Sequence, residues 1–115
     1  MSDREDSPLA ARQCIPCRGG VPKLEPEAAN ALLAQLHENW AILEDHHLQR
    51  EYSFSDFASA LAFVNRVGAL AEAYGHHPDL YLTWGKATVQ IWTHAIDGLT
   101  ESDFVLAAKI DQLQT

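Results

Sequence analysis

Residues 55–78 read SDFASALAFVNRVGALAEAYGHHP and predict the longest helix of the chain. Apolar residues recur in this stretch every three or four positions, which is the period of an amphipathic helix. Ser55 can cap its N-terminus, and Asp56 in the first turn is favourably placed for the helix dipole. The stripe that we expect to face the core includes Phe57, Ala60, Leu61, Phe63, Val64, Val67, Leu70 and Ala71.

The C-terminal end of this helix places two histidines side by side. Gly75 can adopt the left-handed conformation that ends many helices, and Pro78 prevents the helix from resuming. His76 and His77 therefore lie where the helix gives way to the next element. Glu72 lies one helical turn before His76 and can orient an imidazole or stabilise its charged form.

A hairpin is predicted before this helix. WAIL (40–43) and HLQREYSF (47–54) flank a polar stretch, and the second run alternates apolar and polar residues as a half-buried strand does. A second histidine pair, His46 and His47, falls at the predicted turn. We expect this pair to be solvated and without function, so that it serves as an internal control for His76.

A second hairpin is predicted after the helix. LYLTW (80–84) and KATVQIWTHA (86–95) are joined around Gly85, which permits a tight turn. Because alternate residues of a strand face opposite sides, His94 falls on the polar face of the second strand, near its end.

Two further helices are predicted outside the hairpins. Apolar residues at helical spacing follow Pro26, which suits a first helical position, and predict a helix over about 26–38. Thr100 can cap a final helix, with Asp103 three residues on. The order of elements predicts an α+β fold, with a four-stranded antiparallel sheet and three helices on one of its faces. The other face stays open, and His94 should point toward it.

Composition excludes several classes of function. The chain has 115 residues and a formal net charge of −8, with its basic residues scattered, so direct binding to nucleic acid or an anionic membrane is not expected. No apolar run approaches the roughly 20 residues that span a bilayer, and the N-terminus lacks a secretory signal pattern. We expect a cytoplasmic protein.

The chain is expected to form one domain, residues 23–115, preceded by a flexible N-terminal arm over residues 1–22. The arm contains Cys14 and Cys17 in CIPCRGG. A single CxxC lacks the four ligands of a structural zinc site and does not lie between a strand and a helix, so we favour a role as a polar lead-in over a redox or metal role.

Three histidines outside the control pair are candidate catalytic residues. Histidine exchanges protons near neutral pH, so His76, His77 and His94 could divide acid and base work if they converge. From spacing alone the alternative is equally open that the first two only end a helix and the third is a surface residue. A metal site is less favoured, because adjacent histidines are uncommon in chelating motifs.

Several motifs, in the same order and at the same spacing, resemble those of pterin-4a-carbinolamine dehydratases. The similarity includes FSDFASALAFVNRVGALAE and THAIDGLT, and it covers about residues 24–114. The chain departs from the usual pattern at Gly75, Leu80 and Ser102. The residues that carry the resemblance are Trp40, Glu72, His76, His77, Pro78, Tyr81, Trp84, His94 and Asp103.

The resemblance implies a hydro-lyase that removes water from a 4a-hydroxytetrahydropterin, giving quinonoid dihydropterin in pterin recycling, with no metal and no organic cofactor. His76 and His94 would transfer protons, His77 would position the pterin, and Trp40 would contact the flat ring or fill the core. It also implies a homodimer or homotetramer, and an alternative use of the same fold as an interaction module with a protein partner. The implied catalytic residues are His76, His77 and His94, and the implied substrate-binding residues are Glu72, Asp103 and Trp40.

Overall fold

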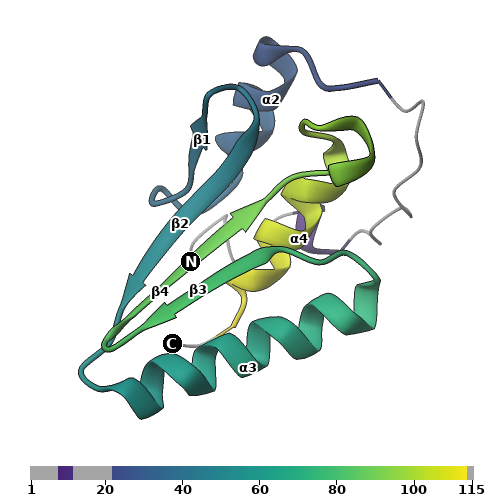
Figure 1. Cartoon of the computed structure of the whole chain (residues 1–115). Helices are drawn as coiled ribbons and strands as arrows, with labels where there is room; N and C mark the ends of the chain where they lie inside the picture. The colour runs from purple at the N-terminus through teal and green to yellow at the C-terminus, as the bar shows by residue number, and fades with distance from the viewer. Residues whose placement is uncertain (1–7, 12–21, 114–115) are drawn as a thin grey trace.

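The computed structural model describes residues 8–11 and 22–113 of the chain (Figure 1). The elements follow in the order α1 (Pro8–Ala11), α2 (Pro26–Leu33), β1 (Ala41–Leu43), β2 (His47–Ser53), α3 (Phe57–Tyr74), β3 (Asp79–Thr83), β4 (Lys86–Ile91), the 3-10 turn η1 (His94–Ile96) and α4 (Glu101–Asp111).

The four strands form one antiparallel sheet in the order β1-β2-β4-β3. Each hairpin supplies two neighbouring strands, and the long pairing of β2 with β4 joins the hairpins, with Gln49 opposite Gln90. Helices α3 and α4 lie on the same side of the sheet (Figure 1). The predicted α+β fold is confirmed.

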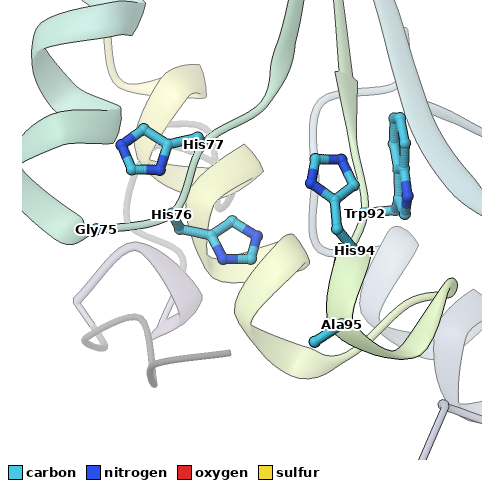
Figure 2. Close-up of a pocket in the computed structure, with 6 residues that line it drawn as sticks. All are labelled: Gly75, His76, His77, Trp92, His94 and Ala95. Carbon is cyan, nitrogen blue, oxygen red and sulfur yellow. The ribbon is translucent and has the colours of Figure 1, made fainter. Parts of the chain in front are cut away.

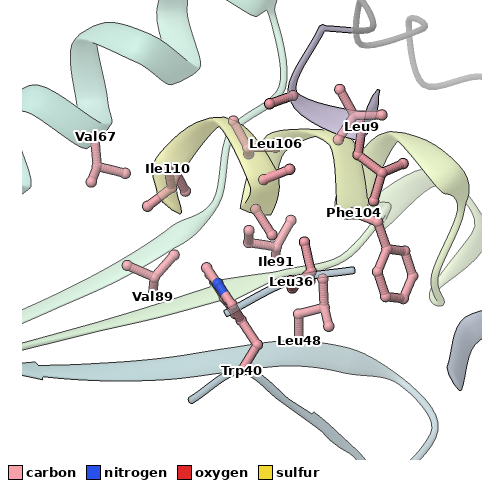
Figure 3. Close-up of a cluster of buried hydrophobic side chains, with 14 of the residues drawn as sticks. Leu9, Leu36, Trp40, Leu48, Val67, Val89, Ile91, Phe104, Leu106 and Ile110 are labelled. Carbon is pink, nitrogen blue, oxygen red and sulfur yellow. The ribbon is translucent and has the colours of Figure 1, made fainter. Parts of the chain in front are cut away.

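Helix α4 lies at the centre of the hydrophobic core. Every residue of it from Ser102 to Ile110 is buried, because α1, α2 and α3 pack against it and its apolar side chains share one core cluster with those of the sheet. Burial of large apolar side chains is the main term that stabilises such a fold. Figure 3 shows the cluster, which includes Leu36, Trp40, Leu48, Val67, Val89, Ile91, Phe104, Leu106 and Ile110.

Helix α2 is shorter than predicted and ends at Leu33 instead of residue 38. The segment after it turns toward the end of α4, where the His37 N–H and the Trp40 indole N–H both donate to the Asp111 carboxylate, at 2.9 and 2.7 Å. These long-range bonds satisfy polar groups that a continued helix would direct elsewhere.

The start of α3 lies one residue later than predicted. Asp56, and not Ser55, is the N-cap, since its side chain accepts a hydrogen bond of 2.7 Å from the Ser59 N–H. Both residue types favour this position, and sequence alone does not choose between neighbours.

Part of the predicted N-terminal arm is folded. Residues 8–11 form α1, in which Leu9 is fully buried. The Lys109 ammonium donates a hydrogen bond of 2.7 Å to the Ala10 carbonyl. This short stretch therefore packs with the domain, while Cys14 and Cys17 lie outside the described residues.

Candidate functional site

The C-terminus of α3 leads directly into two histidines, which precede β3. Gly75 ends the helix at φ +65°, in the left-handed conformation predicted for it. A side chain at this position would be strained, so the glycine fits its place. The chain then leaves the helix axis, and His76 and His77 lie on either side of the turn (Figure 2).

His76 is buried and held by a carboxylate. Its Nε2 lies 2.7 Å from Oδ1 of Asp103, and both side chains are almost fully excluded from water. The second oxygen of Asp103 accepts from the Thr93 hydroxyl at 2.9 Å and from the Thr100 N–H at 2.8 Å. The same carboxylate thus orients His76 and reaches back to cap α4, as the sequence pattern predicted for the helix start.

His77 is exposed and pairs with Glu72 of the last turn of α3. The distance from Nε2 of His77 to Oε1 of Glu72 is 2.6 Å. Since both side chains are more than half exposed, the pair orients the ring and adds little to stability.

His94 approaches from the opposite side of the pocket, as Figure 2 shows. Strand β4 ends at Ile91, and His94 begins the 3-10 turn η1, not the end of a strand as predicted. Its ring is exposed and meets the Trp92 indole edge to face, with centroids 4.4 Å apart. Its Nε2 lies 3.9 Å from Oδ1 of Asp79.

The three imidazoles line one pocket of about 190 Å³, together with Gly75, Trp92 and Ala95 (Figure 2). Ligand sites commonly measure about 300–1,000 Å³. The pocket is therefore large enough to hold only part of a ligand of ordinary size. Converging imidazoles, one held on a buried carboxylate, can take and give protons within such a space.

Trp40 does not line this pocket. It is 3% exposed, belongs to the core, and donates its indole N–H to Asp111. Of the two roles predicted for it, the structure therefore supports core filling. Thr93, the partner of Asp103, was not predicted. The available signal was that it continues the alternation of the core residues Val89 and Ile91, two positions beyond the end of β4.

The expectation that the control pair is solvated was wrong, while its lack of function stays a prediction. His46 lies in the turn and His47 begins β2, and both rings are partly buried against Trp92, with centroids 5.2 and 5.8 Å away. Burial, followed by the neighbouring His46 charge, lowers the pKa of His47 below its ordinary value. The pair is a neighbour of the pocket and cannot serve as its control.

Among the described residues, no helix is long and apolar enough to cross a membrane. In the same part of the chain, no three His, Cys, Asp or Glu side chains are grouped in a way that could hold a metal ion.

Comparison with known proteins assigns the chain to a family. The profile described as Pterin 4 alpha carbinolamine dehydratase matches residues 22–113. The chain belongs to the pterin 4 alpha carbinolamine dehydratase family. The resemblance seen in the sequence is thereby confirmed.

Bacterial members of the pterin dehydratase family resemble the chain over nearly its whole length. A protein of Rickettsia bellii is 54% identical, over 92% of this chain and 94% of its own. One of Rubrobacter xylanophilus is 53% identical, over 93% and 99%. Both are named as pterin-4-alpha-carbinolamine dehydratases whose activity is itself inferred.

Solved structures agree with the fold. A transcriptional coactivator/pterin dehydratase from Brucella melitensis has a TM-score of 0.71 and 28% identity, over 77% of this chain and 95% of that one. A pterin dehydratase-like protein described as a RuBisCO assembly factor in the alpha-carboxysome has a TM-score of 0.56 over 65% and 88%, and at 23% identity it supports the fold alone.

Proposed function

We propose that this chain is a hydro-lyase that converts 4a-hydroxytetrahydropterin to quinonoid dihydropterin and water. The observation that carries the proposal is the convergence of His76, His77 and His94 on one pocket, with His76 held by buried Asp103. Family membership supplies the substrate class, and the imidazoles supply groups suited to its chemistry.

The elimination breaks the bond between C4a and its hydroxyl oxygen. One proton must reach the leaving oxygen, and one must be taken from a ring nitrogen, so that water departs and a double bond forms. We assign these transfers to His76 and His94, which lie on opposite sides of the pocket. When His76 carries a proton, the Asp103 carboxylate stabilises the imidazolium and keeps its ring oriented.

His77 is assigned to positioning the pterin, with Glu72 holding its ring through the 2.6 Å contact. A hydrogen bond that aligns a substrate lowers the barrier by fixing the reacting geometry. Trp40 is assigned no contact with substrate, since it lies in the core. The mechanism needs no metal and no organic cofactor.

The test is the dehydration of freshly generated 4a-hydroxytetrahydropterin, followed by absorbance against the uncatalysed rate. We expect His76→Ala and His94→Ala each to lower kcat by about 10²- to 10⁴-fold, the range for a lost general acid or base. His37→Ala is the matched control, because the His37 ring accepts a hydrogen bond from the N–H of nearby Asn39 and does not line the pocket. A folded wild type that gives no acceleration would favour the interaction module instead.

We also propose a cytoplasmic homodimer or homotetramer. Strand β3 forms one edge of the sheet, with one side of its backbone outside the ladder, and an edge of this kind invites pairing with another chain. Light scattering after size exclusion should give a mass of two or four subunits, and a monomer at micromolar concentration would contradict this.

A further inference from the structure

Backbone strain in the described residues is concentrated at two places beside the pocket. The non-glycine residues with positive φ there are Glu44 at 56°, Asp45 at 53° and Asp97 at 51°. The first two are the centre of the turn between β1 and β2, where asparagine and glycine are the favoured residues. Asp97 ends the 3-10 turn that begins with His94. Non-glycine residues adopt this conformation at a cost, and it often marks a functional position.

The two strained segments are joined by a hydrogen bond. Nε2 of His46 lies 2.7 Å from Oδ1 of Asp97, across 51 positions of the sequence. A carboxylate only accepts, so this nitrogen carries the proton. In a neutral ring Nδ1 of His46 is then an acceptor, and it lies 3.0 Å from Nδ1 of His47, which donates.

Asp97 and His94 belong to one closed turn. The Asp97 N–H donates to the His94 carbonyl at 3.2 Å, and Thr93 and Gly98 exchange hydrogen bonds across the base of the turn. Fixing the Asp97 carboxylate from the neighbouring hairpin therefore fixes the segment that carries His94.

Trp92 provides a second contact between the hairpin and the same histidine. Its indole has the His46 and His47 rings as neighbours and meets the His94 ring at 4.4 Å. The side chain also lines the pocket. The His46 and His47 rings thus pack against the Trp92 indole, which is in turn in contact with the His94 ring.

We infer that His46 is a positioning residue for His94, acting through Asp97 and Trp92. The inference rests on the proposed function for its effect on turnover, and on geometry alone for its effect on the His94 ring. Since a misaligned acid or base slows its step, loss of the contact should lower kcat more than it changes KM.

A double-mutant cycle tests the connection. The variants are His46→Ala, Asp97→Gly and both together; glycine keeps the left-handed turn without strain and removes the carboxylate. We expect each single change to lower kcat about three- to tenfold, as for one lost hydrogen bond, and the double variant to lose no more than His46→Ala alone. Asp97→Asn keeps an acceptor for His46 and should restore most of the rate.

A matched control changes the hairpin turn but keeps His46. The double substitution Glu44→Asn with Asp45→Gly supplies residues that the turn favours, so kcat should stay at the wild-type level. Independent, multiplicative losses from His46→Ala and Asp97→Gly would overturn the inference, as would a loss confined to one of them.

A second readout separates this inference from the proposed function. The ring resonances of His94, assigned by comparison with His94→Ala, are measured by NMR in the protein without substrate. They should shift alike in His46→Ala and Asp97→Gly and stay in place in the turn control, even if the wild type shows no turnover. Unchanged resonances in both variants would overturn the inference whatever the enzymatic result.

Discussion

Two buried aspartates on α4, Asp103 in its first turn and Asp111 at its end, have different partners. Asp103 accepts from the His76 ring, the Thr93 hydroxyl and a backbone N–H. Asp111 accepts from the Trp40 indole at 2.7 Å, the Arg50 guanidinium at 2.8 Å and a backbone N–H. Both carboxylates are almost fully buried.

The difference lies in whether the donors can exchange protons. Arg50 remains charged at any physiological pH and an indole keeps its proton, so the charge of Asp111 is permanently compensated. It also needs this compensation, because the C-terminus of a helix disfavours an anion. The negative charge of Asp103 is favoured by the N-terminus of α4. Its partner His76 is of a residue type that can gain or lose a proton near neutral pH. In the proposed function, the carboxylate that serves catalysis is therefore the one whose donor can exchange its proton.

The largest expected effect on turnover that tests this comparison comes from Asp103→Asn. The amide keeps the shape but loses the charge that supports a protonated His76, so kcat should fall by about 10²-fold, the lower end for acid and base catalysis. Steady-state kinetics of the variant measures this. Asp111→Asn is the control, and a similar loss of kcat there would remove the distinction.

Asp111→Ala should have the largest effect on stability. It leaves the Arg50 charge without its carboxylate partner, and breaking a buried ion pair costs about 3 kcal/mol. Urea unfolding measures the loss, while kcat per folded molecule should be unchanged. If the free energy of unfolding stayed at the wild-type value, Asp111 would not have the structural role given to it here.

Glu72→Gln tests an exposed carboxylate paired with a histidine. Since the contact with His77 is open to water, we expect no change in unfolding free energy and a rise in KM of about two- to fivefold. Saturation curves with the pterin substrate check this. A kcat loss as large as that of Asp103→Asn would instead assign proton transfer to His77.

The smallest effect on turnover should come from Asp56→Ala at the start of α3, far along the chain from the pocket residues. Its effect on stability should depend on pH. The Ser59 N–H lowers the pKa of Asp56 below its ordinary value. The stabilisation is therefore present above the ordinary pKa of an aspartate and is lost as the pH falls through the lowered value. Unfolding curves should separate wild type and variant at pH 7 and converge in acid; a gap that persists in acid would contradict the capping role.

Local patterns predicted most of the fold. The period of the helix over 57–74 and the alternation in both hairpins depend on neighbours in sequence, and so does the left-handed Gly75. Helix α1 was not predicted, because four residues carry no helical period and burial of Leu9 against α4 decides its structure.

The sequence predicted the three histidines of the candidate site, but it did not predict the contacts that hold them in place. His76, His77 and His94 were found from spacing and resemblance, and the structure brings all three to one pocket. The contact of His46 with Asp97 depends on how the turns at the ends of β2 and β4 meet in space, and no sequence pattern reports it. For the same reason Trp40 could not be assigned to the core until its bond to Asp111 was seen.

The packing of α1 limits where the N-terminus of this protein can be truncated without loss of stability. The family similarity begins at residue 22, yet a chain trimmed there would lose the Leu9 side chain from the core and the Ala10 carbonyl that receives Lys109. The ammonium of Lys109 also lies 4.1 Å from the centre of the Tyr74 ring, next to the glycine that ends α3. The N-terminal limit of the family similarity thus differs from the limit of the packed structure. The shorter chain would be less stable close to the turn that bears His76.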